Sequence, residues 1–312
     1  MPTLVTGATG FLGRHLLELL LGRTELRALC RSPVDARLLR RSGVDVVIGD
    51  VLDPASVRAA LAGCETVYHL AGLVSHRRRD RARLHGANVE GVRNVLAAVE
   101  PGARLVHVSS VAAIGPAPGP GRAVDECHVF PPAAARLPYA ASKRAGEQLV
   151  LAAARRGVDT VVANPGFLLG PGDVHRVSTW HVGRYLAGRL RFTAAGGLSN
   201  VDARDVAAGL VMLAERGRRG ERYILTSREG NLDHRDFFRR LTAVTGIRRR
   251  MLRLPPRLAL AAARVPLAPV HRDEVEAACN WWFYDPAKAE HELGFTTRPL
   301  DETLADTASA SR

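Results

Sequence analysis

Short apolar runs alternate with longer stretches of helical periodicity through the first half of the chain. The β-rich runs that end at glycine or polar residues predict strands at 3–8, 25–31, 44–50, 66–72, 104–110 and 159–166. Between them, apolar positions spaced three and four apart predict helices at 11–21, 53–63, 88–100 and 138–157. This alternation predicts an α/β fold, a doubly wound parallel sheet with helices on both faces.

Beyond about residue 170 the pattern loosens into a mixed arrangement. Helices are expected at 178–188, 203–217, 233–246 and 285–295, with short apolar runs at 191–197 and 222–227. We therefore expect a first domain over 1–168 and a smaller mixed α/β C-terminal lobe over 169–312, with segments near 200–226 returning to the first domain. A helix within Leu252–Arg272 is expected to pack on the lobe, and the proline-rich loop Pro116–Pro132 to form one wall of a site.

Composition adds constraints on partners and compartment. The chain is 46% hydrophobic and 24% charged, which is typical of a globular protein, and its net charge is +13. Arginine runs at 76–83, 215–222 and 247–253 could bind nucleic acid or anionic lipid. They lack the interleaved aromatic residues of a stacking platform, so we interpret them as solvated loops and expect no nucleic acid binding.

The remaining composition points to a reducing compartment. The four cysteines form no CxxC pair, which argues against a zinc site and a disulfide framework. No apolar run reaches the length of a membrane span, although a peripheral contact through Leu252–Arg272 stays open. We expect a cytoplasmic protein with no metal site and no stable membrane insertion.

Three glycines, Gly7, Gly10 and Gly13, stand where the first predicted strand gives way to a helix. In this context the first glycine makes the turn, the second lets a pyrophosphate approach the backbone, and the third lets helix and strand pack closely. The helix N-terminus adds oriented N–H groups. The first domain is therefore predicted to be a dinucleotide-binding Rossmann domain, and the C-terminal lobe to bind mainly the substrate.

The end of the second predicted strand favours one nucleotide. It reads Arg31-Ser32, with no carboxylate to bind the ribose hydroxyls of NAD(H). An arginine there would pair with a 2′-phosphate, and Arg14 could reach the same group. NADP(H) is therefore favoured, while NAD(H) stays open because Arg31 could be an ordinary surface cation.

Tyr139 and Lys143 lie four residues apart on one predicted helix and therefore share a face. A lysine ammonium one turn away would lower the pKa of the phenol and could hold the cofactor ribose. A preceding strand ends in Ser109 and Ser110, and one of these hydroxyls could polarise a substrate carbonyl while Tyr139 supplies the proton.

The order of these motifs resembles the extended short-chain dehydrogenases/reductases, the NAD-dependent epimerase/dehydratase group. The resemblance rests on "TGATGFLG", "GDVLDP", "VYHLAG", "NVEGVRNVL", "VSSVAAIG", "YAASK", "NPGFLLGPGD" and "FYDPAKAEHELGF", and it covers nearly the whole chain. Within the group the chain is most similar to the dihydroflavonol-reductase-like and hopanoid-associated sugar-epimerase-like branches.

The resemblance implies roles for particular residues. It implies a catalytic triad of Ser110, Tyr139 and Lys143, with Ser110 chosen over Ser109 because it lies five residues before Gly115. It implies cofactor contacts from Gly7, Gly10, Phe11, Leu12, Asp50, Val51, Ala71, Gly72, Pro165, Gly166 and Phe167, in addition to Gly13, Arg14, Arg31 and Ser32 considered above.

Two departures put a nucleotide-sugar substrate in doubt. Asn164 replaces a common arginine, and Ile114 replaces an aromatic residue that often contacts sugar. The favoured function is an NADPH-dependent ketoreductase acting on a small, ring-bearing carbonyl compound of polyketide or flavonoid type. Trp180, His181, Tyr185 and Phe192 are candidates for its pocket. The alternatives are a sugar or nucleotide-sugar epimerase/dehydratase and a non-catalytic NADP(H) sensor, and a homodimer is possible.

Overall fold

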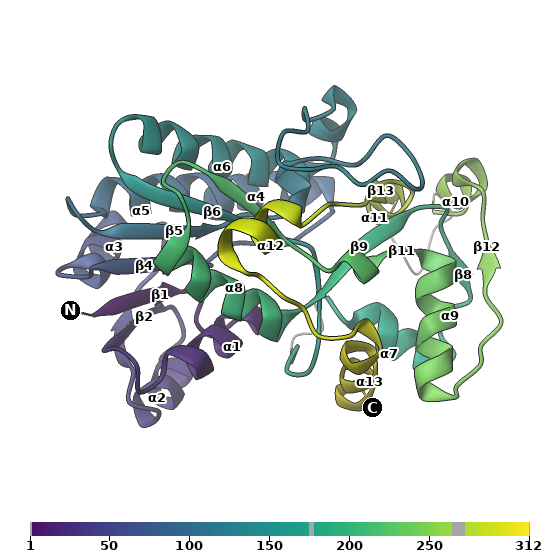
Figure 1. The fold of residues 1–312 in the computed structure, drawn as a ribbon, viewed down its shortest axis with the longest axis horizontal. Helices are drawn as coiled ribbons and strands as arrows, with labels where there is room; N and C mark the ends of the chain where they lie inside the picture. Colours follow the sequence, from purple (N-terminus) through teal and green to yellow (C-terminus); the bar gives the residue numbers. More distant parts are fainter. Residues whose placement is uncertain (1, 175–177, 264–271, 312) are drawn as a thin grey trace.

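The computed structural model describes residues 2–174, 178–263 and 272–311. Seven parallel strands form its main sheet, in the order β3-β2-β1-β4-β5-β6-β10 (Figure 1). Their bounds are β1 Thr3–Thr6, β2 Leu26–Cys30, β3 Asp45–Ile48, β4 Thr66–His69, β5 Arg104–Val108, β6 Asp159–Pro165 and β10 Arg222–Leu225. The order reverses between β1 and β4, which is where ligands bind in open sheets of this kind. The predicted doubly wound Rossmann-type sheet is confirmed.

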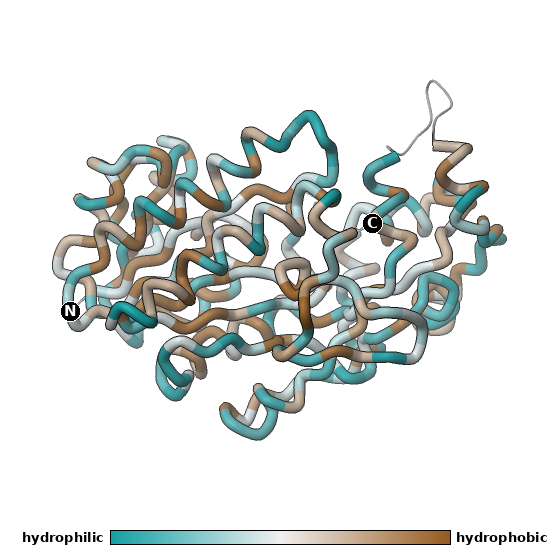
Figure 2. Tube along the Cα trace, turned by 90° about the horizontal axis from the view of Figure 1, so that it is seen from above, coloured by the Kyte–Doolittle hydropathy of each residue, from teal (hydrophilic) through white to brown (hydrophobic). Residues whose placement is uncertain are grey.

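Helices cover both faces of this sheet. One side carries α1 Phe11–Leu20, α2 Pro33–Arg41 and α8 Ala203–Arg216, and the other α3 Pro54–Leu61, α5 Gly91–Ala98 and α6 Pro138–Arg155. Successive strand residues serve opposite faces: Val5 packs with α1 and α8, whereas Leu4 packs with α3. Hydrophobic and hydrophilic positions alternate along the covering helices (Figure 2), so each helix buries one stripe.

The segment after β4 is irregular. It passes through a 3₁₀ turn at Arg78–Asp80, α4 at Arg81–His85 and a π-helical turn at Gly86–Glu90 before α5 begins. Further 3₁₀ turns lie at Val111–Ala113, Pro132–Arg136 and Arg228–Gly230. These turns follow β4, β5 and β10, so they shape the edge of the sheet at which its strands end.

The C-terminal lobe is built on a second sheet. Its strands are β7 Phe167–Leu169, β9 Gly197–Asp202, β11 Asn231–Asp233 and β13 Trp281–Trp282, and a separate ribbon pairs β8 Phe192–Thr193 with β12 Leu252–Arg253. The lobe also contains α7 Trp180–Leu186, α9 His234–Thr245, α10 Pro256–Ala262, α11 Arg272–Ala278, α12 Ala287–Leu293 and α13 Leu300–Ala310. Figure 1 shows most of the lobe at the right.

The two parts of the chain are interwoven. β10 pairs with β6 in the main sheet, and α8 packs on α1. Ala289 and Leu293 of α12, together with Phe295, join the core between the sheet and α8. The division at residue 168 stays a prediction, because three segments of the second half complete the core of the first.

The sequence analysis missed the short helices α4 and α11, and also α2 and α13, which have weakly apolar faces. In α2 only Ala36 is buried, although Ser32 caps the helix and Pro33 begins it. In α13 the buried face includes Thr303 and Thr307, so its periodicity carries few large apolar residues. The helix expected within Leu252–Arg272 covers only Pro256–Ala262, and residues 264–271 lie outside the described part. Among the described helices, none is long and apolar enough to cross a membrane.

Gly146 controls how closely α6 approaches the π-helical turn. A Cβ atom at this position would lie 2.1 Å from the carbonyl oxygen of Asn88, a backbone atom that cannot move independently. By contrast, a Cβ atom at Gly119 meets no atom within 4 Å.

We therefore expect Gly146→Ala to lower the free energy of unfolding by about 2 kcal/mol through overpacking. Urea unfolding measures this change, with Gly119→Ala as the control that should leave stability nearly unchanged. Equal stabilities of the two variants would contradict the close approach of α6.

Candidate active site

The glycine turn lies at the end of β1, beside the end of β4. Gly7 has a φ of +71°, and a Cβ atom there would lie 2.7 Å from the backbone nitrogen of Ala71. A Cβ atom at Gly13 would lie 2.2 Å from the carbonyl oxygen of Gly7. Gly10 is the N-cap of α1 and contributes no side chain. These positions leave room for a pyrophosphate at the N-terminus of α1, so the residues present fit a dinucleotide.

Two buried histidines, His69 and His107, lie next to the glycine turn. Thr6 Oγ1 accepts a hydrogen bond from the Ala71 N–H at 3.2 Å and lies 2.8 Å from Nδ1 of His69. The His69 ring stacks on His107 of β5 at 5.4 Å. Burial, followed by the charge of Lys143, lowers the pKa of His69 to about 3, and burial also lowers that of His107. Both rings are therefore neutral. The sequence analysis assigned them no role because each lies inside a run that it interpreted only as a strand.

The predicted 2′-phosphate contacts lie around the ends of β2 and β3. The Arg31 side chain is 80% exposed, and its Nη1 lies 3.7 Å from Oδ2 of Asp50. The Ser32 hydroxyl accepts the Asp35 N–H at 3.2 Å as the cap of α2. Arg14 is exposed and donates to the Thr9 carbonyl. The guanidinium of Arg31 is therefore accessible at this edge.

Tyr139 and Lys143 occupy one face of α6, which begins at Pro138. The Lys143 ammonium donates to the Val108 carbonyl at 2.9 Å and would lie 3.8 Å from a Cβ atom at Gly72. Burial lowers its pKa to about 8, opposed by the charge of Glu147. The structure corrects one expectation: burial raises the pKa of Tyr139, whereas the sequence analysis expected Lys143 to lower it.

The two serines after β5 have different surroundings. A side-chain hydrogen bond joins Ser110 to Tyr139 and favours the ionised phenol. Ser110 Oγ also accepts the Ala112 N–H at 3.2 Å, as the cap of the 3₁₀ turn. Ser109 is buried, and its hydroxyl has no hydrogen-bond partner within the described ranges. The structure thus brings Ser110, Tyr139 and Lys143 together.

A buried network behind the triad escaped the sequence analysis. Asn164 Nδ2 donates to the Ser110 carbonyl at 2.9 Å and to Glu147 Oε2 at 2.6 Å. Glu147 is fully buried, and its other oxygen accepts from Arg222 of β10 at 2.9 Å. The spacing of Tyr139, Lys143 and Glu147 by four residues each could have revealed the carboxylate. Arg222 therefore compensates the buried charge of Glu147.

Asn88 and Tyr284 hold the two loops that flank the triad. In the π-helical turn, Asn88 accepts the Leu73 N–H at 2.8 Å and donates to Ser142 Oγ at 3.0 Å. The Tyr284 hydroxyl shares its one proton between the carbonyls of Val111 and Gly115, which lie 3.0 and 2.8 Å from its oxygen. The strand ends that carry the site are therefore fixed from both parts of the chain.

The segment Pro165, Gly166 and Phe167 leads from β6 into the lobe. A Cβ atom at Gly166 would lie 2.5 Å from the Ser199 carbonyl oxygen, so the chain passes tightly between its neighbours. The Phe167 ring lies edge-on to His181 of α7 at 5.3 Å. Burial lowers the pKa of His181 to about 4.

The remaining pocket candidates are placed differently from one another. Tyr185 is 1% exposed and stacks on Phe238 in the lobe core, so it is no pocket residue, whereas Phe192 is 53% exposed.

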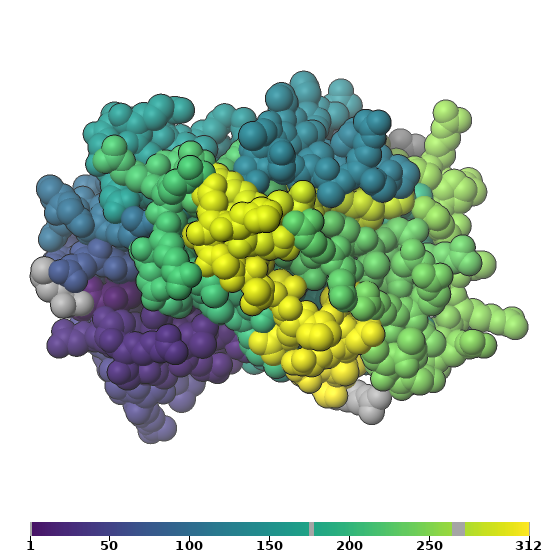
Figure 3. Space-filling view, in the orientation of Figure 1, coloured from purple at the N-terminus to yellow at the C-terminus, as the bar shows by residue number. Residues whose placement is uncertain are grey.

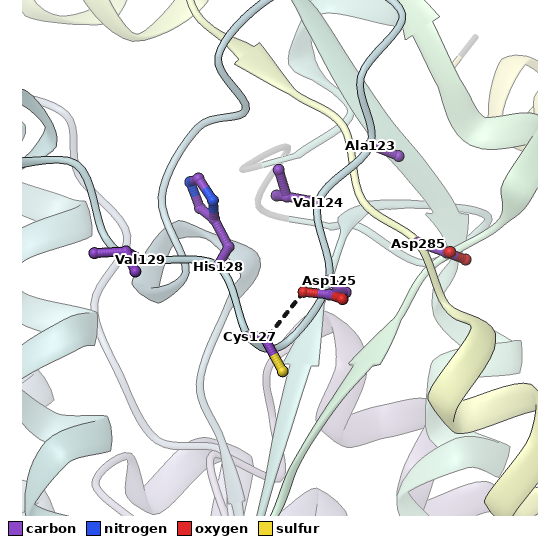
Figure 4. Close-up of a pocket in the computed structure, with 7 residues that line it drawn as sticks. All are labelled: Ala123, Val124, Asp125, Cys127, His128, Val129 and Asp285. Atoms are coloured by element: carbon purple, nitrogen blue, oxygen red, sulfur yellow. Dashed lines mark hydrogen bonds between the residues drawn. The ribbon is translucent and has the colours of Figure 1, made fainter.

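The loop Pro116–Pro132 forms a hollow of about 500 Å³ (Figure 4). The residues that line it are Ala123, Val124, Asp125, Cys127, His128, Val129 and Asp285, none of them among the predicted catalytic or cofactor-binding residues. Within the described part of the chain, no cluster of three or more His, Cys, Asp or Glu residues could hold a metal ion.

Ion pairs fasten the loop after β4 to α11 beside Tyr139. The His76 ring lies edge-on to that of Tyr139 at 5.8 Å. The next two residues pair with the lobe: Arg77 with Glu274 at 3.7 Å, and Arg78 with Asp273 and Glu276 at 2.9 and 3.2 Å. We call Arg77, Arg78, Asp273, Glu274 and Glu276 the arginine clamp. It joins the two parts of the chain at the edge of the site.

A model of the NAD dependent epimerase/dehydratase family matches residues 3–225. The chain belongs to this family. It is therefore an NAD(P)-dependent oxidoreductase of the short-chain dehydrogenase/reductase type, as the motifs indicated.

Individual relatives agree with this assignment. The chain is 34% identical to a Synechocystis sp. protein provisionally named dihydroflavonol 4-reductase, over 97% of this chain and 92% of that one. It is 35% identical to the 4-hydroxy-2-methyl-3-oxo-4-farnesyl-3,4-dihydroquinoline-1-oxide ketoreductase of Stigmatella aurantiaca, over 85% and 79% of the two chains. The crystal structure of gox2253 superposes with a TM-score of 0.85 at 30% identity, over 99% and 97% of the two chains.

The buried Lys143 makes stability depend on pH. Its pKa is about 8 in the folded chain against an ordinary 10.5, so between these values the unfolded chain binds more protons. Wild-type stability, relative to Lys143→Met, should therefore rise by about 2 kcal/mol between pH 8 and about pH 10.

Urea unfolding at both pH values tests this, with Lys288→Met as the control because Lys288 pairs with the half-exposed Glu221. A stability difference between wild type and Lys143→Met that does not change with pH would contradict a buried ammonium.

Proposed function

We propose that the protein is an NADPH-dependent ketoreductase that reduces a carbonyl of a small, ring-bearing metabolite. The observation that carries this proposal is the joint placement of Ser110, Tyr139 and Lys143 beside the glycine turn. The bound nicotinamide would supply the hydride. The ketoreductase relative supports this reaction class, and the site residues named above are assigned to the cofactor and the substrate on the same grounds.

The protein groups would handle the proton and the carbonyl oxygen. Ser110 would donate a hydrogen bond to the carbonyl, and Tyr139 would transfer its phenolic proton to the oxygen as the carbon is reduced to an alcohol. Burial raises the pKa of Tyr139, so the phenol stays protonated at neutral pH, which suits the direction of reduction. The Lys143 ammonium would stabilise the phenolate that remains.

Arg31 supports NADPH as the preferred cofactor. Its guanidinium is 80% exposed, and its contact with Asp50 is long at 3.7 Å, so little competes with a 2′-phosphate. A charge-assisted bond to phosphate is stronger than a long surface pair.

We further infer a small-molecule carbonyl substrate and a homodimer. We also infer a cytoplasmic location, with which the four free thiols are consistent.

The first experiment identifies any nucleotide released on denaturation and then follows NADPH consumption with a panel of aromatic and alicyclic ketones. An empty site that binds NADPH and reduces a ketone would support the proposal. Tightly held NAD⁺ and no ketone reduction would instead favour the epimerase alternative, in which the cofactor is recycled in place.

Tyr139→Phe should reduce kcat by roughly 10²- to 10⁴-fold, because the proton donor is lost, while Kd for NADPH changes little. Ser110→Ala should reduce kcat in the same direction. Ser109→Ala is the matched control and should retain wild-type activity. Equal losses from the two serine variants would contradict the assignment of Ser110.

Arg31→Asp should weaken NADPH binding by about tenfold without weakening NADH binding, because it removes the partner of the 2′-phosphate and adds a carboxylate that can bind the ribose hydroxyls of NADH. Fluorescence titration measures both Kd values. Arg37→Asp, an equal charge change on the exposed side of α2, is the control. An NADPH affinity that both variants lower equally would point to general surface charge instead.

A further inference from the structure

The ribbon of β8 and β12 exposes apolar side chains at the end of the lobe opposite the N-terminus (Figure 1). Phe192 and Leu252 are register partners, so they lie side by side, and they are 53% and 64% exposed. Leu258 of α10, shortly after β12, is 58% exposed. The light green atoms of Figure 3, which include the segment around β12 and α10, form the right-hand end of the molecule.

The same region carries concentrated positive charge. The segments 184–193 and 246–263 contain eight arginines and no aspartate or glutamate. Arg253 lies 3.8 Å from Asp233, a long contact, and Arg249 donates to the Leu186 carbonyl. Within the described residues the others on the exposed surface have no carboxylate partner: Arg189, Arg191, Arg248, Arg250 and Arg257.

This lack of partners separates one arginine run from the other two. In the run 76–83, Arg78 pairs with Asp273 and Glu276 in the arginine clamp. In the run 215–222, Arg218 pairs with Glu292 and Arg222 with Glu147. The run 247–253 is the one whose charge the fold leaves largely uncompensated.

We propose that this region, here called the arginine tip and defined by β8, β12, residues 248–250 and the start of α10, docks on an anionic membrane surface. Arginines would bind lipid phosphates while Phe192, Leu252 and Leu258 enter the boundary of the acyl chains. Contact would be peripheral, since no described helix can span a bilayer.

Other occupants fit the arginine tip less well. A second copy of this chain placed tip to tip would bring the same positive charges together, which is unfavourable. Single-stranded nucleic acid would need several stacking rings, and the tip offers only Phe192 among its exposed side chains. Docking of the arginine tip would not depend on the proposed reductase activity.

Co-sedimentation of the full chain with vesicles tests the proposal. We expect binding to vesicles of phosphatidylcholine mixed with phosphatidylglycerol, weak binding to phosphatidylcholine alone, and loss of binding at high salt. Leu252→Ser/Arg250→Gln should bind the anionic vesicles about tenfold more weakly.

Leu21→Ser/Arg23→Gln is the matched control, because it changes an exposed leucine and arginine at the end of α1, and it should bind as wild type does. Circular dichroism and Tm verify that both variants fold. Absence of binding to anionic vesicles, equal loss in both variants, or binding to duplex DNA without vesicle binding would overturn the proposal.

Discussion

The buried ammonium of Lys143 is the charge on which the rest of the site depends. A charge removed from water is costly unless nearby groups compensate it. The Val108 carbonyl accepts a hydrogen bond from the ammonium at 2.9 Å, and Glu147 adds an opposite charge one turn along α6. The same positive charge favours the neutral state of His69 and His107, so one lysine influences the ends of both β4 and β5.

Glu147 extends this dependence to the second half of the chain. Its carboxylate pairs directly with Arg222, which comes from β10, and it also holds Asn164 against the Ser110 carbonyl. Breaking a buried pair by removing one partner costs several kcal/mol, on the order of 3–5. β10 therefore balances charge in the site as well as completing the main sheet. Separating the two parts of the chain would remove the arginine partner of Glu147.

Much of the first domain was predictable because its signals are local. Each of the first six main-sheet strands is a short apolar run ending at glycine or polar residues, and Gly7, Gly10 and Gly13 stand at a strand–helix junction. Ser110, Tyr139 and Lys143 were predictable as a group because spacing and motif order mark them.

The partners of these residues were not predictable in the same way. Arg222 lies 75 residues from Glu147, and Tyr284 lies 169 residues from Gly115, so no local pattern links either pair. The face of α13 buries threonines, whose polarity hides the helical period. The pKa of Tyr139 was expected in the wrong direction because burial, the dominant cause, cannot be judged from spacing.

The ion pairs of the arginine clamp contribute little free energy to the edge of the site. Its side chains are partly exposed, so each pair contributes at most about 1 kcal/mol, and dissolved ions screen it within roughly 8 Å at physiological ionic strength. Contacts this weak break and re-form without disturbing the cores on either side. The edge beside Tyr139 is thus held by contacts that weaken as ionic strength rises, whereas the apolar cores on either side are not screened.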